Sequence, residues 1–149
     1  MAQKGYDTNL ASEFYVMSVL HRLGCDATIT LGNKKAVGIL VARGVGEAVT
    51  IDVKAVAGKT DWLAGSGADS AKQNHFVVMV SYEGRFKEPA ELPRCWIVPH
   101  TAYLDLVKTA STGNLKYISR KAVVSELTGY ENAWELIVGD KSADLAQDQ

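Results

Sequence analysis

Few of the features that mark secreted, membrane-spanning or strongly basic proteins occur in this sequence. It has two cysteines, Cys25 and Cys95, whose spacing matches no metal-binding motif, and this predicts reduced thiols in a cytoplasmic protein. No run of about 18 apolar residues is present, so we expect no membrane span. No apolar signal core follows Met1. The formal net charge of −1 leaves no overall electrostatic footprint for nucleic acid.

The composition is that of an ordinary globular chain. Its 149 residues are 47% apolar and 22% charged, enough for one domain with a sizeable core. The charge is uneven, because residues 34–72 carry six Lys and Arg against four Asp and Glu. The last ten residues are mostly polar and acidic, so we expect residues 140–149 to form a flexible tail.

Residues 25–55 predict three short strands. Apolar residues alternate with others over 37–42 and again over 49–54, which is the period of a strand with one apolar face. A turn centred on Val45 pairs residues whose numbers sum to 90, so Gly38 is expected opposite Asp52. Asp52 and Lys54 are two residues apart and share that face.

A helix is predicted over residues 8–23, ended by Gly24. Glu13 projects from its apolar arc. A carboxylate that faces a core needs a partner, which favours a functional role; the alternative is an acid in the first turn, where the helix dipole stabilises it and water reaches it.

The rest of the chain alternates between strands, helices and one long connection. Residues 57–74 are predicted to be a loop that borders the hairpin, in which Trp62 caps the sheet edge or, alternatively, stacks on a base. Further elements are expected as strands over 75–81 and 94–98 and helices over 99–108, 120–127 and 131–138. His21, His75 and His100 are isolated in the sequence and are expected to be structural.

The ordered set of a helix glutamate, a strand pair and Asp-x-Lys resembles the PD-(D/E)xK nuclease superfamily. Its members have a restriction-endonuclease-like or Holliday-junction-resolvase-like fold. The resemblance covers residues 8–100: Asp52-Val53-Lys54 matches the (D/E)xK element and Glu13 matches the helix glutamate. The first aspartate of the superfamily's motif falls in Val37-Gly38-Ile39, where this sequence has Gly38.

The resemblance implies a single nuclease-like domain over residues 1–139, with a mixed β-sheet flanked by helices and an αβββαβ core. It implies a metal-dependent phosphodiesterase or endonuclease that acts on DNA. Asp52 and the backbone carbonyl of Val53 would be ligands of Mg²⁺ or Mn²⁺, Lys54 the catalytic cation and Glu13 a further acid of the site. Gly38 would be a vacated ligand position, so the cation would be held weakly.

Three functions remain open at this level. In the first, Gly38 impairs or abolishes the nuclease activity. In the second, another acid, Glu13 or Asp26, compensates for Gly38 and the protein cuts DNA. In the third, the fold is a non-catalytic module that binds nucleic acid or protein, and lysines contact phosphates without chemistry. A homodimer is compatible with each. The lysines expected to bind nucleic acid, besides Lys54, are Lys34, Lys35 and Lys59.

Overall fold

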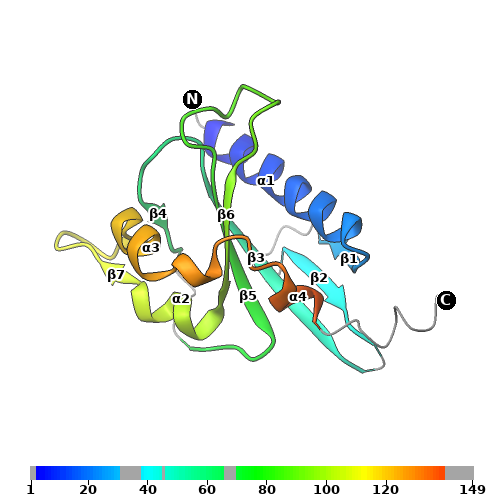
Figure 1. Cartoon of the computed structure of the whole chain (residues 1–149). Coiled ribbons are helices and arrows are strands. Elements are labelled where there is room, and N and C mark those ends of the chain that lie inside the picture. The colour runs from blue at the N-terminus through cyan, green and yellow to red at the C-terminus, as the bar shows by residue number, and fades with distance from the viewer. Residues whose placement is uncertain (1–2, 31–37, 45, 66–69, 140–149) are drawn as a thin grey trace.

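The computed structural model describes residues 3–30, 38–44, 46–65 and 70–139, with only the backbone of residues 3–6 (Figure 1). The tail predicted over 140–149 lies outside this part. The larger elements are α1 (Gln3–Arg22), β1 (Asp26–Ile29), β2 (Ile39–Ala42), β3 (Ala48–Val56), β5 (His75–Ser81), β6 (Arg94–Pro99), α2 (His100–Leu106) and α3 (Arg120–Glu126). The smaller ones are β4 (Trp62–Leu63), β7 (Lys108–Thr109), β8 (Lys116–Ile118), the 3₁₀ helix η1 (Thr128–Tyr130) and α4 (Glu135–Val138). None of the described helices has the length and apolar character of a membrane span.

The main sheet is mixed, as predicted. Its five strands lie in the order β1-β2-β3-β5-β6, with β3 and β5 parallel and the other neighbours antiparallel. The β2–β3 register pairs Ile39 with Ile51 and Ala42 with Ala48, so the numbers sum to 90 as the predicted turn requires. A second sheet of three short strands has the order β4-β8-β7.

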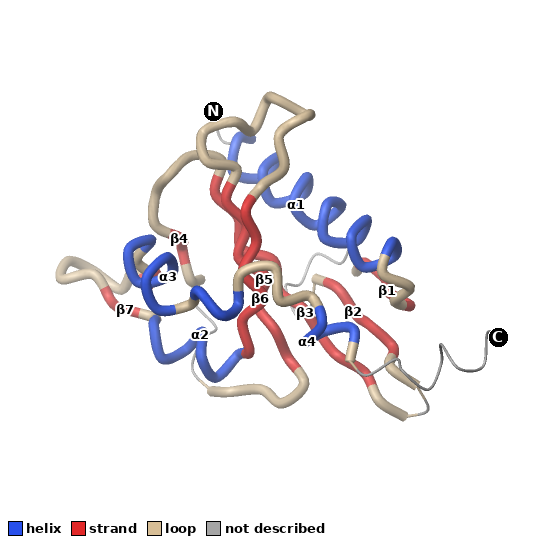
Figure 2. The backbone as a smooth tube through the Cα atoms, viewed as in Figure 1, coloured by secondary structure: helices blue, strands red, loops and turns tan. Residues whose placement is uncertain are grey.

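Alternation along the strands gives the main sheet two buried faces. The first face packs α1 and α4 against β1, β2, β3, β5 and β6, through residues such as Val16, Leu20, Ile51, Val78 and Ile137. The second packs α2, α3 and the small sheet against β5 and β6, through Trp62, Met79, Trp96, Tyr103 and Val123. Figures 1 and 2 show α1 on one side of β5 and β6, and α2 and α3 on the other. The fold class is therefore the predicted mixed sheet flanked by helices.

Several local expectations need correction. The connection predicted over 57–74 contains β4, which pairs with β8, and the part of it that the structure describes holds no helix in the place that an αβββαβ order gives one. The first helix begins at Gln3 rather than at residue 8. The last helix is confined to α4, because residue 131 instead forms a β-bridge with Trp96.

Trp62 is a core residue and not a base-stacking platform. Its side chain is buried, its indole N–H donates to the carbonyl of Val80 at 3.2 Å, and its ring meets that of Trp96 edge-on at 5.8 Å. The guanidinium of Arg120 lies over the same ring, 5.6 Å from its centroid. The ring of Trp62 is enclosed, as expected for a structural residue, so neither face of the ring is available to stack on a nucleobase.

Candidate nuclease-like site

The candidate site is built on the second face of β3. In this strand the odd-numbered Val49, Ile51 and Val53 are buried, so Asp52 and Lys54 lie on the opposite side. The ammonium of Lys54 is 3.2 Å from the Oδ2 of Asp52, and the side chains are 25% and 43% exposed respectively. A half-exposed ion pair of this kind adds at most about 1 kcal/mol to stability. The fold therefore does not depend on this pair, and both side chains can contact a ligand.

Gly38 lies beside this pair, at the end of β2. A Cβ on Gly38 would be 3.9 Å from the Oε1 of Glu13 and 3.3 Å from the carbonyl oxygen of Ile51. The carboxylate of the first helix therefore reaches the position where the resemblance leaves a ligand missing. A side chain at residue 38 fits only with a small shift of its neighbours.

Glu13 is in the middle of α1, which begins at Gln3, and not in the first turn. Glu13 is therefore not a first-turn acid that the helix dipole stabilises. Burial raises the pKa of the Glu13 carboxyl, and the negative charge of Asp52 raises it further. The charge of Asp52 therefore acts on Glu13, and a cation bound between the two carboxylates would relieve their repulsion.

The backbone of β3 directs the Val53 carbonyl toward the same region. The amide of Thr50 donates to the carbonyl of Asn74, so even-numbered residues of β3 bond toward β5. Odd-numbered residues point to the other side because backbone groups alternate along a strand. Val53 therefore points to the β2 side of β3, beyond the last pair that the two strands form, Ile39 with Ile51.

These groups fit a weakly held hard cation. In the part of the chain that the structure describes, no cluster of three or more His, Cys, Asp or Glu side chains is arranged around one point. What converges is two carboxylates, Glu13 and Asp52, and one backbone carbonyl, with water left to complete the shell. Oxygen donors of this kind suit Mg²⁺, which keeps several waters.

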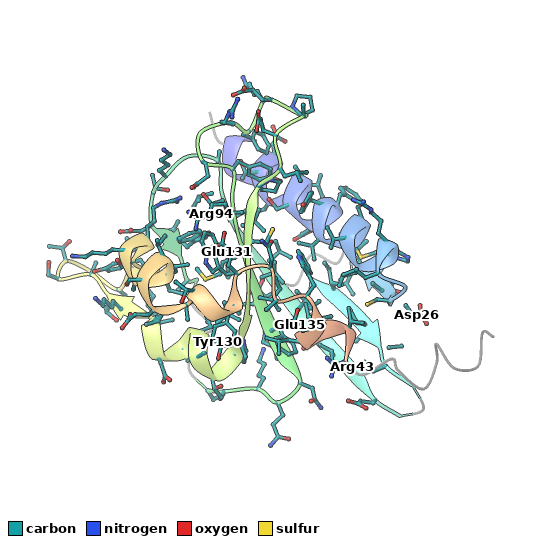
Figure 3. The ribbon with its side chains drawn as sticks, in the orientation of Figure 1. Asp26, Arg43, Arg94, Tyr130, Glu131 and Glu135 are labelled. Atoms are coloured by element: carbon teal, nitrogen blue, oxygen red, sulfur yellow. The ribbon has the colours of Figure 1, made fainter. Side chains whose placement is uncertain are left out.

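Asp26 does not compensate for Gly38. It is exposed and pairs with Ala42, whereas the carbonyl of Gly38 accepts from the amide of Thr30 at the other end of the β1–β2 ladder. Four residues of strand span about 13 Å. Figure 3 shows Asp26 at the margin of the molecule, beyond the end of α1. Of the two acids considered, only Glu13 approaches the site.

The lysines predicted to contact nucleic acid are only partly placed. Lys34 and Lys35 lie outside the described residues. Lys59 is exposed in the turn that follows β3. Lys54 has a further neighbour in Gly65, whose Cβ position would be 3.5 Å from the ammonium and whose φ of +74° favours glycine. A side chain at residue 65 would make an ordinary van der Waals contact with the ammonium, so glycine there leaves Lys54 more open.

Two histidines that the sequence analysis expected to be isolated lie together, within range of the charge of Asp52. The rings of His75 and His100 meet edge-on at 4.7 Å, so they are not isolated. Both are nevertheless satisfied buried groups, as expected: Nδ1 of His75 is 2.6 Å from the hydroxyl of Thr50, and Nδ1 of His100 accepts from the amide of Lys72 at 2.9 Å. Burial lowers the pKa of His75 to about 4, helped by His100 and Lys72 and opposed by Asp52.

No local signal in the sequence reveals this histidine pair. His75 reaches Thr50 only through the parallel pairing of β5 with β3, and His100 comes next to it only because β6 returns beside β5. Tyr103, on α2, completes the group: its ring stacks on that of His100 at 6.1 Å, and its buried hydroxyl has no hydrogen-bond partner among the residues that the structure describes. Burial and the charge of Asp52 both raise the pKa of Tyr103.

Comparison with known proteins supports the fold but not a family. No protein-family model matches the sequence, and no curated protein matches it either. The structure is similar to that of a bacterial homing endonuclease, I-Ssp6803I, with a TM-score of 0.53 and 16% sequence identity, over 95% of this chain and 96% of the other. The chain therefore has an endonuclease-like α/β fold.

Proposed function

We propose that this protein is a metal-dependent nuclease of the PD-(D/E)xK type that acts on DNA and is impaired by Gly38. The observation that carries the proposal is the convergence of the Asp52–Lys54 ion pair with Glu13 at the end of β2. It is supported by the overall similarity to a homing endonuclease. We propose residues 1–139 as one nuclease-like domain.

In this mechanism each side chain has a separate task. Asp52, Glu13 and the carbonyl of Val53 would hold Mg²⁺ or Mn²⁺, which when bound neutralises phosphate charge and lowers the pKa of a water molecule. The ammonium of Lys54, 25% exposed and kept open by Gly65, would contact a non-bridging phosphate oxygen and stabilise the charge that develops there. Asp52 positions that ammonium through their contact at 3.2 Å.

The second candidate is a non-catalytic nucleic-acid-binding module, and Gly38 is the observation that favours it. Because residue 38 has no carboxylate, only two of the described acids, Glu13 and Asp52, approach the site. A cation would need both of them. If no cation is retained, Lys54 and Lys59 remain as phosphate-binding groups with no attacking water. The two candidates predict the same DNA affinity and opposite results in a cleavage assay.

A cleavage assay with matched lysine variants tests the proposal. Supercoiled and linear DNA are incubated with the protein in Mg²⁺, in Mn²⁺ and in a chelator. We expect slow, metal-dependent cleavage, reduced by a factor of about 10² to 10³ in Lys54→Ala and unchanged in Lys87→Ala. Lys87 is an exposed lysine of the β5–β6 turn, at the far end of the sheet. DNA binding without any cleavage would leave the binding module; cleavage that survives Lys54→Ala would remove Lys54 from the mechanism.

A further inference from the structure

A recess of about 520 Å³ opens at the end of the main sheet where β5 begins and β6 ends. We call it the Lys72 recess. It is separate from the Asp52–Lys54 pair, and none of the roles assigned above uses it. Its wall combines apolar groups with polar side chains, among them Arg43, Lys72, Asn74, His75, His100 and Thr101.

The wall of the recess is held to β3 and to the start of α2. The carbonyl of Asn74 accepts from the amide of Thr50 at 3.0 Å, and Asn74 adopts a left-handed backbone with φ of 53°. The amide of Lys72 donates to Nδ1 of His100. Residues 72–75 are therefore pinned at both ends, which is the preorganisation that a binding site needs.

The recess carries an unbalanced positive charge. Among the described residues, the Lys72 ammonium has no carboxylate within ion-pair distance, and Lys72 is exposed. Arg43 is already engaged: its guanidinium donates to the carbonyls of Leu136 and Ile137 at the end of α4, as Figure 3 lets the reader follow, and lies 3.7 Å from Glu47. Lys72 is thus the cation that remains for a ligand.

Neutral donors stand next to that cation. Because Nδ1 of His100 accepts a hydrogen bond, the proton of its neutral ring is on Nε2, which makes that nitrogen a donor. Burial and the charge of Lys72 lower the pKa of the His100 ring, and the charge of Asp52 opposes them. An ammonium beside N–H and O–H donors is the donor set for a phosphate oxygen.

The position of the recess relates it to the candidate site. Thr50, which contacts His75 in the wall, precedes Asp52 by two residues on the same face of β3. Two residues of strand span about 7 Å. Lys54 lies two residues further along, about 13 Å from Thr50, so a strand of nucleic acid with one phosphate at Lys54 would reach the Lys72 recess with another phosphate further along the strand.

We propose that the Lys72 recess binds a backbone phosphate of the nucleic acid, on the same strand as the phosphate held at Asp52 and Lys54. The inference rests on the proposed function for the identity of the ligand. Lys72 supplies the charge that binds the phosphate, and His100 and Thr101 supply neutral donors. The recess would then set which bond of the strand faces Lys54, without being needed for the chemistry itself.

The salt dependence of DNA binding tests this inference. A short synthetic DNA duplex is titrated in a chelator, so that no cleavage occurs, with the wild type, Lys72→Ala and Lys87→Ala. One lost phosphate contact lowers the slope of log K against log salt by about 0.9. We expect that change, and about fivefold weaker binding at low salt, in Lys72→Ala alone. NMR shifts of the His100 ring should accompany binding in the wild type.

The outcomes separate the inference from the proposed function. Equal slopes in Lys72→Ala and Lys87→Ala overturn the Lys72 recess as a phosphate site, even if the protein cleaves DNA. A slope that falls only in Lys72→Ala supports the recess, even if no cleavage is found and the nuclease proposal is lost. Inorganic phosphate serves as the second probe. If it shifts the NMR signals of the His100 ring at concentrations at which the duplex causes no shift, the recess is a free-phosphate site and the nucleic-acid assignment is wrong.

Discussion

Two charged clusters on the second face of the sheet are built in opposite ways. The first, which we call the arginine cluster, joins Arg94 and Arg120 to Glu83 and Glu131, so two cations meet two anions. Arg94 makes a two-bond contact with Glu131, at 2.8 and 3.0 Å, and its guanidinium lies over Trp96. Figure 3 shows Arg94 and Glu131 side by side.

The second cluster is the candidate site, where the charged groups are two carboxylates, Glu13 and Asp52, and one ammonium, that of Lys54, which contacts Asp52. The consequence appears in the pKa values: hydrogen bonding to Arg94 lowers the pKa of Glu131, whereas burial and Asp52 raise the pKa of Glu13. A balanced cluster stabilises the fold, and an unbalanced one leaves charge for a ligand to satisfy. The balance of charges therefore separates the arginine cluster, which stabilises the fold, from the candidate site, which could bind a ligand.

The largest effect is expected from Gly38→Asp, which adds a third carboxylate to the candidate site. The new carboxylate would point at Oε1 of Glu13, so it adds repulsion and slightly destabilises the metal-free fold. Added Mn²⁺ should restore the stability, and metal-dependent cleavage should appear or rise by a factor of at least about 10². Thermal shift against Mn²⁺ concentration and a DNA cleavage assay measure both. Gly38→Asn, which fits the same space without the charge, is the control; a variant that gains neither metal response nor cleavage shows that Gly38 is not a vacated ligand position.

A second test uses His75, on whose pKa the charge of Asp52 also acts. Its pKa is lowered to about 4 in the folded protein, against 6.5 for an ordinary histidine. The unfolded chain therefore takes up a proton first as the pH falls, so the stability from neutral His75 is complete above pH 6.5 and is lost progressively down to about 4. We expect the loss to be of order 2 kcal/mol. Urea unfolding from pH 7 to 4 should show a smaller loss in His75→Gln, and NMR titration of the ring checks the pKa directly; equal slopes in both proteins contradict the argument.

The arginine cluster supplies the third test. Glu83 contacts both Arg94 and Arg120 and accepts from the hydroxyl of Ser81, so Glu83→Gln removes the charge that two partly buried cations share. We expect a loss of about 1–2 kcal/mol in unfolding free energy. Glu88→Gln, in the exposed pair with Arg85, is the matched control and should leave stability unchanged. A larger effect at Glu88 than at Glu83 would invalidate the division into scaffold and site.

The smallest effect is expected from Asp52→Asn. This change removes the partner of Lys54 but also the negative charge that opposes ionisation of Glu13, so the two effects offset each other. Stability should change by no more than about 0.5 kcal/mol. The pKa of the Glu13 carboxyl should fall relative to the wild type, which NMR titration can follow. An unchanged Glu13 pKa would show that the two carboxylates do not share a space.

Local patterns in the sequence account for much of the site. The alternation over 49–54 places Asp52 and Lys54 on one face, and the turn after Gly44 sets the β2–β3 register, because strand period and hairpin register depend only on neighbouring residues. The uninterrupted apolar run over 75–81 likewise predicts a central strand, which β5 confirms. The start of α1 and the pairing of β4 with β8 were missed because propensity near Gln3 and in residues 57–74 is weak.

What the sequence by itself determined is therefore the chemistry of β3: a carboxylate and an ammonium side by side, with glycine nearby. Only the tertiary structure decided what surrounds them. The approach of Glu13 follows from the packing of α1 on the sheet, and the position of Gly65 beside Lys54 follows from the pairing of β4 with β8. The meeting of His75 with His100 follows from the parallel β3–β5 pair and the return of β6. These contacts join residues distant in the chain, and no local periodicity encodes them, because their geometry is set by how the apolar faces bury one another.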